Sequence, residues 1–216
     1  MKARNTLHTE KFNAPAAIPL AEDVQKLYSF LKERIKEKVE ELNEDRSSAT
    51  LWYDLCRLSA AYVLLFNRRR PGELSRLTLE TFQKKMKGIQ NDDIQQSLSQ
   101  SERLLASSLE MVEIRGKRGK KVPVLFNKIS MEAINCLLKH RAKCSVKNDN
   151  KFVFAIPGCD TPVRITDGMR EFAKRCGAKE PSLLTATYLR KHVATSCQLL
   201  GGERTRPYAT LFLFTY

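Results

Sequence analysis

Residues 49–67 constrain the fold of this chain more than any other segment. They read ATLWYDLCRLSAAYVLLFN, without proline or glycine and with only two charged side chains. Leu51, Leu55 and Leu58 recur at steps of three or four residues, which is the period of a helix, and small or apolar residues occupy the other faces. A helix that is apolar almost all round is a buried one. We therefore expect the rest of the chain to fold around this segment.

The flanking segments carry amphipathic and turn-bounded patterns. Over 20–42 the apolar residues fall at steps of three or four, opposite a face rich in lysine and glutamate, which predicts a helix of about six turns. Pro71 cannot donate a backbone hydrogen bond, so it forces a break or a new helix start, and a short helix is expected over 73–82. Runs at 110–115 and 121–126 flank a glycine-bearing turn and predict a β-hairpin. The remaining expected elements are a helix or loop over 91–108, helices over 130–141, 166–176 and 184–200, and a short strand over 152–155.

Together these elements predict an α+β fold that is mainly helical, with a small antiparallel β-hairpin or three-stranded sheet. Thr166 or Asp167 is expected to cap the helix that follows it.

The pattern divides the chain into three parts. Residues 1–47 form a lead-in and an amphipathic linker helix, 48–200 form the main domain, and 201–216 form an atypical tail with a crowded apolar run.

The charge balance narrows the choice of partners. Lysine and arginine number 38 against 24 aspartates and glutamates, a formal net charge of +14. Such an excess favours a polyanion, nucleic acid first and an anionic membrane surface second. No apolar run reaches the roughly 18 residues of a membrane span and no apolar signal region opens the chain, so an intracellular protein without a membrane partner is expected. The six cysteines form neither a C-x-x-C pair nor a cluster with histidine, so no metal and no cofactor are expected.

Three basic sites stand out, and each also has a purely structural interpretation. The arginines at 68–70 follow the apolar helix and favour anionic partners, although cations also suit the C-terminal end of a helix dipole. Residues 115–121 place five cations in seven at the hairpin turn, where they can contact DNA phosphates or form a plain solvated turn. Arg190 lies on a predicted helix and, taken alone, is typical of a surface residue. The candidate DNA contacts are Arg69, Arg115, Arg118, Lys120, Lys121, Thr187 and Lys191.

The order of the three sites resembles the catalytic domain of tyrosine recombinases, the phage integrase family, in the form found in eukaryotic mobile elements. The matching segments are RPGELSRL at 70–77, RGKRGKKVP at 115–123 and YLRKHVAT at 188–195. The resemblance covers about residues 48–200 of the chain.

What the resemblance implies is a phosphodiester chemistry without metal or cofactor. Arg70 and Arg190 would hold the non-bridging oxygens of the phosphate under attack, since arginine is permanently charged and binds two oxygens at once. Lys117 on the hairpin would protonate the leaving oxygen. In the family a tyrosine is the nucleophile and forms a phosphotyrosyl intermediate.

The chain departs from the family pattern in two places. Thr187 stands three residues before the second arginine, where the family often has histidine, and threonine cannot act as a base near neutral pH. His192 lies about 200° round the helix from Arg190 and points elsewhere. Tyr208 and Tyr216 lack a helical pattern, so no nucleophilic tyrosine is identified and the catalytic domain is expected to be incomplete at its C-terminal side.

The favoured function is therefore DNA binding within DNA recombination or integration. The expected partner is double-stranded DNA, with self-association on DNA and a nuclear location. The alternative is a non-catalytic, domesticated recombinase-fold module that binds nuclear proteins. An RNA-binding helical protein ranks third, because the sequence has neither an aromatic RNA-binding strand motif nor a Gly-x-x-Gly clamping loop.

Overall fold

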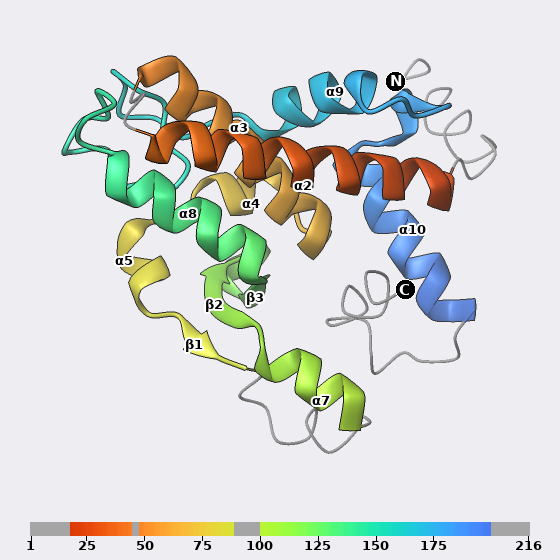
Figure 1. Cartoon of the computed structure of the whole chain (residues 1–216). Coiled ribbons are helices and arrows are strands. Elements are labelled where there is room, and N and C mark those ends of the chain that lie inside the picture. Colours follow the sequence, from red (N-terminus) through yellow and green to blue (C-terminus); the bar gives the residue numbers. More distant parts are fainter. Residues whose placement is uncertain (1–17, 45–47, 89–99, 200–216) are drawn as a thin grey trace, which may run out of the picture.

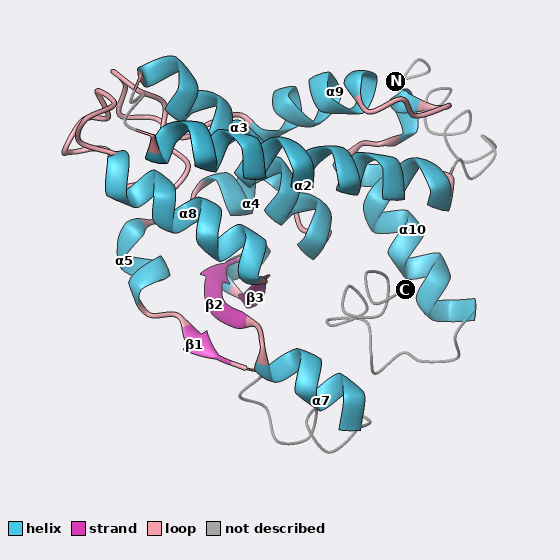
Figure 2. Cartoon of the chain, viewed as in Figure 1, coloured by secondary structure: helices cyan, strands magenta, loops and turns pink. Residues whose placement is uncertain are grey.

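The computed structural model describes residues 18–44, 48–88 and 100–199. Over these ranges the chain is mainly helical, with one small three-stranded antiparallel sheet, and the predicted α+β fold class is confirmed (Figure 2). None of the helices in these ranges combines the length and apolar character of a membrane span.

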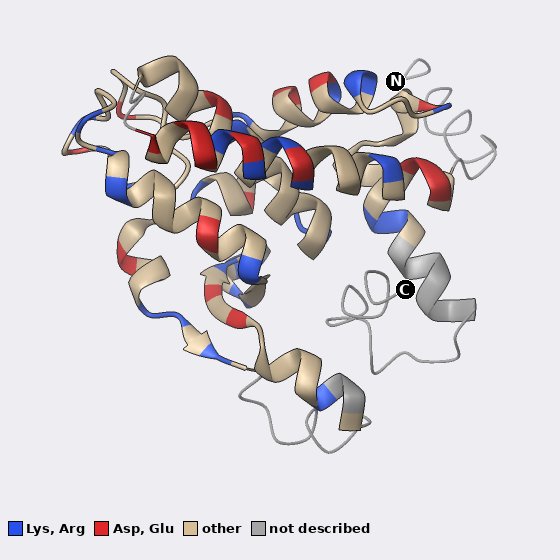
Figure 3. Cartoon of the chain, viewed as in Figure 1, with Lys and Arg blue, Asp and Glu red and all other residues tan. Residues whose placement is uncertain are grey.

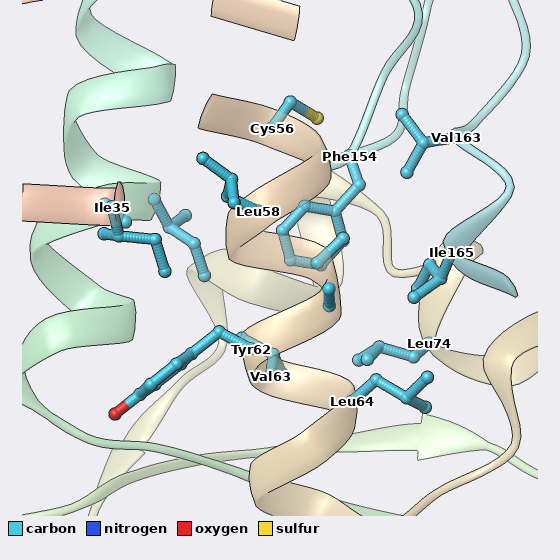
Figure 4. Close-up of a cluster of buried hydrophobic side chains, with 14 of the residues drawn as sticks. Ile35, Cys56, Leu58, Tyr62, Val63, Leu64, Leu74, Phe154, Val163 and Ile165 are labelled. Carbon is cyan, nitrogen blue, oxygen red and sulfur yellow. The ribbon is translucent and has the colours of Figure 1, made fainter. Parts of the chain in front are cut away.

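The apolar helix α3 (Ala49–Asn67) lies at the centre of the molecule, as predicted. Its N-cap Ser48 accepts a hydrogen bond from the backbone of Leu51, and nearly every residue of its second half is buried. It packs against α2, α8, α9 and the strand β3 (Figure 1). Figure 4 shows Ile35 on one side of α3 and Phe154, Val163 and Ile165 on the other, all within one hydrophobic core.

Helix α2 (Ala21–Asn43) is the predicted amphipathic helix. Its apolar residues from Val24 to Leu42 are buried in the same core as α3. At its N-terminal end the Asp23 carboxylate is fully buried and accepts hydrogen bonds from the backbone nitrogens of Lys179 and Glu180, at 2.8 and 2.9 Å. Because both partners lie in the loop that follows α9 (Ile165–Arg175), this contact joins the first described helix to the C-terminal part of the fold.

The sheet has the order β1-β2-β3, with β2 (Glu110–Arg115) and β3 (Lys121–Phe126) forming the predicted hairpin. Arg115 pairs with Lys121 at the end of the ladder, and a 3-10 turn, η1 (Lys117–Gly119), connects the strands. Arg118 (φ 60°) and Gly119 (φ 75°) both adopt the left-handed conformation that this tight turn requires. The remaining strand, β1 (Met86–Lys87), pairs with β2.

The strand predicted over 152–155 is wrong. This segment forms only isolated bridges, from Phe152 to Thr78 and from Ala155 to Pro162. Its apolar run has a different cause, because Val153 and Phe154 are fully buried in the core as part of an irregular segment. An unbroken run of apolar residues indicates that a segment is buried on all sides, but it does not by itself distinguish a strand from a packed loop.

The single helix predicted over 73–82 is instead two short ones, α4 (Pro71–Ser75) and α5 (Leu79–Gln83). The backbones of Leu77 and Leu79 exchange hydrogen bonds with the 151–153 segment, which interrupts the helix. Thr78 then starts α5 by accepting a hydrogen bond from the backbone of Thr81.

The remaining helices are α7 (Gln100–Ser107), α8 (Lys128–His140), α9 and α10 (Ala186–Leu199), with a 3-10 turn η2 (Pro181–Leu183) before α10. The predicted side-chain cap of α9 is wrong. The N-cap residue is Arg164, two or three residues before the predicted Thr166 or Asp167, and no side-chain hydrogen bond caps the helix there. Thr166 and Asp167 therefore lie inside the first turn. Leu189 of α10 is buried in the core, which sets the rotation of that helix.

Candidate functional site

A cavity of about 400 Å³ lies where the start of α4, the first half of α9 and the first turns of α10 meet. We call it the arginine cavity. Three arginines, three threonines and no carboxylate line it among the described residues. The lining residues are Arg70, Pro71, Thr166, Met169, Arg170, Thr185, Ala186, Thr187 and Arg190.

The end of α3 determines which of the three consecutive arginines reaches this cavity. Arg68 ends the helix with a left-handed backbone (φ 52°) and is buried, and this burial lowers the pKa of its guanidinium to about 9. Arg69 is half-buried and does not line the cavity. Arg70 follows as the N-cap residue of α4, with Pro71 at the first helical position, and its side chain is 56% exposed.

Arg70 and Arg190 are close enough to influence each other electrostatically. The pKa of Arg190 is lowered, first by partial burial and then by the positive charge of Arg70, while the Glu73 carboxylate opposes the shift. Glu73 is almost buried and lies 3.3 Å from the Nη1 atom of Arg70. One carboxylate therefore faces two guanidinium groups, and the arrangement carries an excess of positive charge.

The other members of the cavity add donors and a further cation. Thr187 is exposed, and Arg170 lies 4.0 Å from the Asp167 carboxylate, its one ion pair with the described residues. An ion pair at that distance between two exposed side chains is weak. Guanidinium groups bind phosphate oxygens in pairs, and threonine hydroxyls donate single hydrogen bonds, so the arginine cavity has the donor set of a phosphate site.

The hairpin turn lies beside this site. A Cβ atom added to Gly116 would be 3.6 Å from the Oε1 atom of Glu73, so the first residue of the turn approaches the same carboxylate that holds Arg70. Figure 3 shows lysine and arginine at the hairpin end and in the first half of α10. The predicted contacts Arg115, Arg118, Lys120 and Lys121 are all exposed there.

Lys121 and Lys117 are the remaining predicted residues of the hairpin. Lys121 pairs with Glu113 across the hairpin at 2.8 Å, and this hydrogen bond raises the pKa of its ammonium group. Lys117 begins the turn, and its side chain lies outside the described part of the structure. The structure therefore brings together Arg70, Thr187 and Arg190, and leaves the position of the Lys117 ammonium group open.

The other predicted residues of α10 lie away from the cavity. Lys191 is exposed, with its ammonium group 5.6 Å from the centre of the Tyr188 ring. His192 is half-buried, and its pKa is lowered by burial and by the charge of Arg68. Arg68 and His192 thus belong to the packing between α3 and α10, on a different side of the helix from Arg190. Tyr208 and Tyr216 lie outside the described residues.

Sequence reasoning missed Arg170, Thr166 and Thr185 as members of the site. The sequence indicated Thr166 only as a helix cap, and α9 also has an apolar face that includes Met169 and Phe172. Thr166 and Arg170 are four residues apart, so they share a face of α9 next to that apolar face. This spacing could have indicated a polar face of the helix, but only the position of α10 shows that the face lines a cavity.

A metal site is absent from the described part of the chain. Within 18–44, 48–88 and 100–199 no three histidine, cysteine, aspartate or glutamate side chains gather as they would around a metal ion. Comparison of the chain with protein-family models, with curated proteins and with solved structures finds no match.

Proposed function

We propose that the chain binds double-stranded DNA through the arginine cavity and the hairpin turn, as a DNA-binding protein of recombination or integration that resembles the catalytic domain of tyrosine recombinases. The observation that carries the proposal is the lining of the cavity, with three arginines, three threonines and no carboxylate among the described residues. These arginines come from three separate elements, α4, α9 and α10.

A phosphodiester suits this cavity for physical reasons. Its non-bridging oxygens carry a permanent negative charge, and each can accept hydrogen bonds from a guanidinium fork. Binding would also offset the repulsion between Arg70 and Arg190, which adds to burial in lowering the pKa of Arg190 in the free protein. A small neutral ligand would leave that repulsion unrelieved.

The same arrangement would stabilise a phosphate under attack, because the pentacoordinate phosphorus carries more negative charge than the starting diester. No tyrosine among the described residues lines the cavity. The described part of the chain therefore supplies phosphate binding and charge stabilisation, and a strand-cleaving nucleophile would have to come from elsewhere.

The test measures binding of a fluorescent DNA duplex by anisotropy at several salt concentrations. We expect Arg70→Ala and Arg190→Gln each to weaken binding by about tenfold or more, since each removes a charged hydrogen-bonding group. Lys174→Ala is the matched control, because Lys174 is an exposed cation on α9 that does not line the cavity.

Thermal unfolding of the same variants separates function from folding. Arg190→Gln removes a partly buried charge that Arg70 repels, so its stability should equal or exceed that of the parent chain while its DNA affinity falls. Duplex binding that is unchanged in both arginine variants, or equally reduced by Lys174→Ala, would contradict the proposal. Absence of any duplex binding by the parent chain would favour a non-catalytic protein-interaction module.

A further inference from the structure

A second, larger cavity of about 830 Å³ adjoins the arginine cavity. We call it the flanking groove. Pro71 and Thr166 line both spaces, so the two are neighbours across the start of α4 and the first turn of α9. Its volume lies within the range of about 300–1,000 Å³ that is usual for small-ligand sites, which accommodates a nucleotide.

Three charged residues line the flanking groove among the described residues: Arg57, Arg164 and Asp167. The guanidinium of Arg57 is held by the Glu171 carboxylate, which also pairs with Arg175. Asp167 lies 4.0 Å from Arg170, a weak contact between two exposed side chains. Arg164 is exposed, and among the described residues it has no ion pair. An arginine without an ion pair in a groove favours a ligand that places a negative charge at that point.

The walls of the groove are suited to a sugar and a base. Ile156 and Pro162 are partly exposed apolar residues of its lining, and the Tyr53 ring is partly exposed as well. The Arg57 guanidinium lies 5.7 Å from the centre of the Tyr53 ring and 5.5 Å from that of Phe172. The tyrosine is therefore held in place by a fixed neighbour, as an aromatic surface for base stacking should be.

We propose that the flanking groove binds the nucleotide next to the phosphate in the arginine cavity, with that nucleotide's phosphate on Arg164 and its base or sugar against Tyr53 and the apolar wall. This inference rests on the proposed function and extends it. The ligand is a nucleic-acid strand, because a strand is the anion that places a second phosphate and an apolar ring at a fixed short distance from the first.

The experiment uses 5′-phosphorylated oligothymidylates of one to four nucleotides as competitors of the labelled duplex. For the parent chain, we expect the second nucleotide to strengthen competition by about tenfold, the effect of one charged contact. Arg164→Ala should abolish this increase and leave competition by the mononucleotide unchanged. Arg190→Gln should weaken competition at every length. Lys174→Ala should change neither the competition by the mononucleotide nor the gain from the second nucleotide.

Two further measurements keep the inference open to contradiction. Tyr53→Leu keeps an apolar side chain but removes the ring. It should reduce the gain from the second nucleotide by severalfold without changing competition by the mononucleotide. If Arg190→Gln weakens competition by the mononucleotide but the gain from the second nucleotide persists in Arg164→Ala, the flanking groove does not bind that nucleotide while the proposed function stands. If Arg190→Gln has no effect at any length, the proposed function itself fails. An acidic peptide that competes with the same dependence on Arg164 would overturn the choice of a nucleic-acid strand.

Discussion

Substituting Gly116 with alanine should loosen the hairpin where it meets the arginine cavity. The added Cβ would lie 2.4 Å from the Cγ2 atom of Val122 and 3.2 Å from the backbone oxygen of Lys120. Carbon atoms in contact are normally about 3.5–4.0 Å apart, so one of these groups must move by roughly 1 Å. Val122 has a branched and stiff side chain, and the Lys120 oxygen accepts the hydrogen bond of the Gly116 nitrogen, so neither moves freely.

The expected size of the effect follows from this geometry. Overpacking of this kind costs about 1–3 kcal/mol in free energy of unfolding. Alanine also restricts the unfolded chain, which offsets roughly 0.4–1 kcal/mol, because the backbone of Gly116 (φ −91°) is one that alanine adopts without strain. We therefore expect a net loss of about 1–2 kcal/mol, measured by urea denaturation with an unchanged slope.

The double variant with Val122→Ala provides the control. Val122→Ala removes the Cγ2 atom that clashes, so Gly116→Ala should cost much less in that background than in the parent chain. The same clash should push the turn away from Glu73 and reduce duplex DNA affinity, which Val122→Ala should partly restore. A neutral Gly116→Ala variant, or a cost that does not depend on Val122, would refute the reasoning.

Four further outcomes are expected. Asp23→Ala should lower the free energy of unfolding, measured by urea denaturation, by on the order of 3 kcal/mol. The variant loses a buried carboxylate that accepts two backbone hydrogen bonds. Burial lowers the pKa of His192, so the unfolded chain binds the proton more readily than the folded chain. The free energy of unfolding should therefore fall as the pH drops below the ordinary pKa of histidine. His192→Gln should flatten that part of the curve of unfolding free energy against pH. Replacing Lys117, Lys120 and Lys121 with alanine should weaken binding to all duplex sequences alike and reduce the salt dependence, as anisotropy titrations against several unrelated duplexes would show. A nicked suicide DNA substrate should yield no denaturant-resistant adduct with the purified chain; an adduct that disappears on Tyr208→Phe or Tyr216→Phe would identify a working nucleophile.

The elements that depend on local pattern were predictable from the sequence. The central helix over 49–67 and the two hairpin strands begin and end where their composition changes. Their periodicity and turn residues act over a few residues, and that is the range over which a single sequence carries information. Arg70 and Arg190 became candidate residues through the resemblance to tyrosine recombinases, because the local pattern around Arg190 is only that of a surface residue.

The segment over 152–155 and the break within 73–82 were decided by tertiary structure. Thr78 bridges Phe152, and the neighbouring backbones exchange hydrogen bonds, so each segment takes its form from the other. Neither partner carries a local signal for this pairing, because a backbone hydrogen bond does not depend on the identity of the side chain.

The site shows the same division. The resemblance singled out Arg70 among three consecutive arginines, but the reason that Arg70 faces the cavity is tertiary. The left-handed backbone of Arg68 ends α3, and the new helix start at Pro71 turns Arg70 toward the cavity. Arg170 entered the site only through packing, since the core contacts of Met169 and Leu189 set how α9 and α10 face each other. A cavity exists only between packed elements, so its lining is a property of the tertiary structure and not of any one segment.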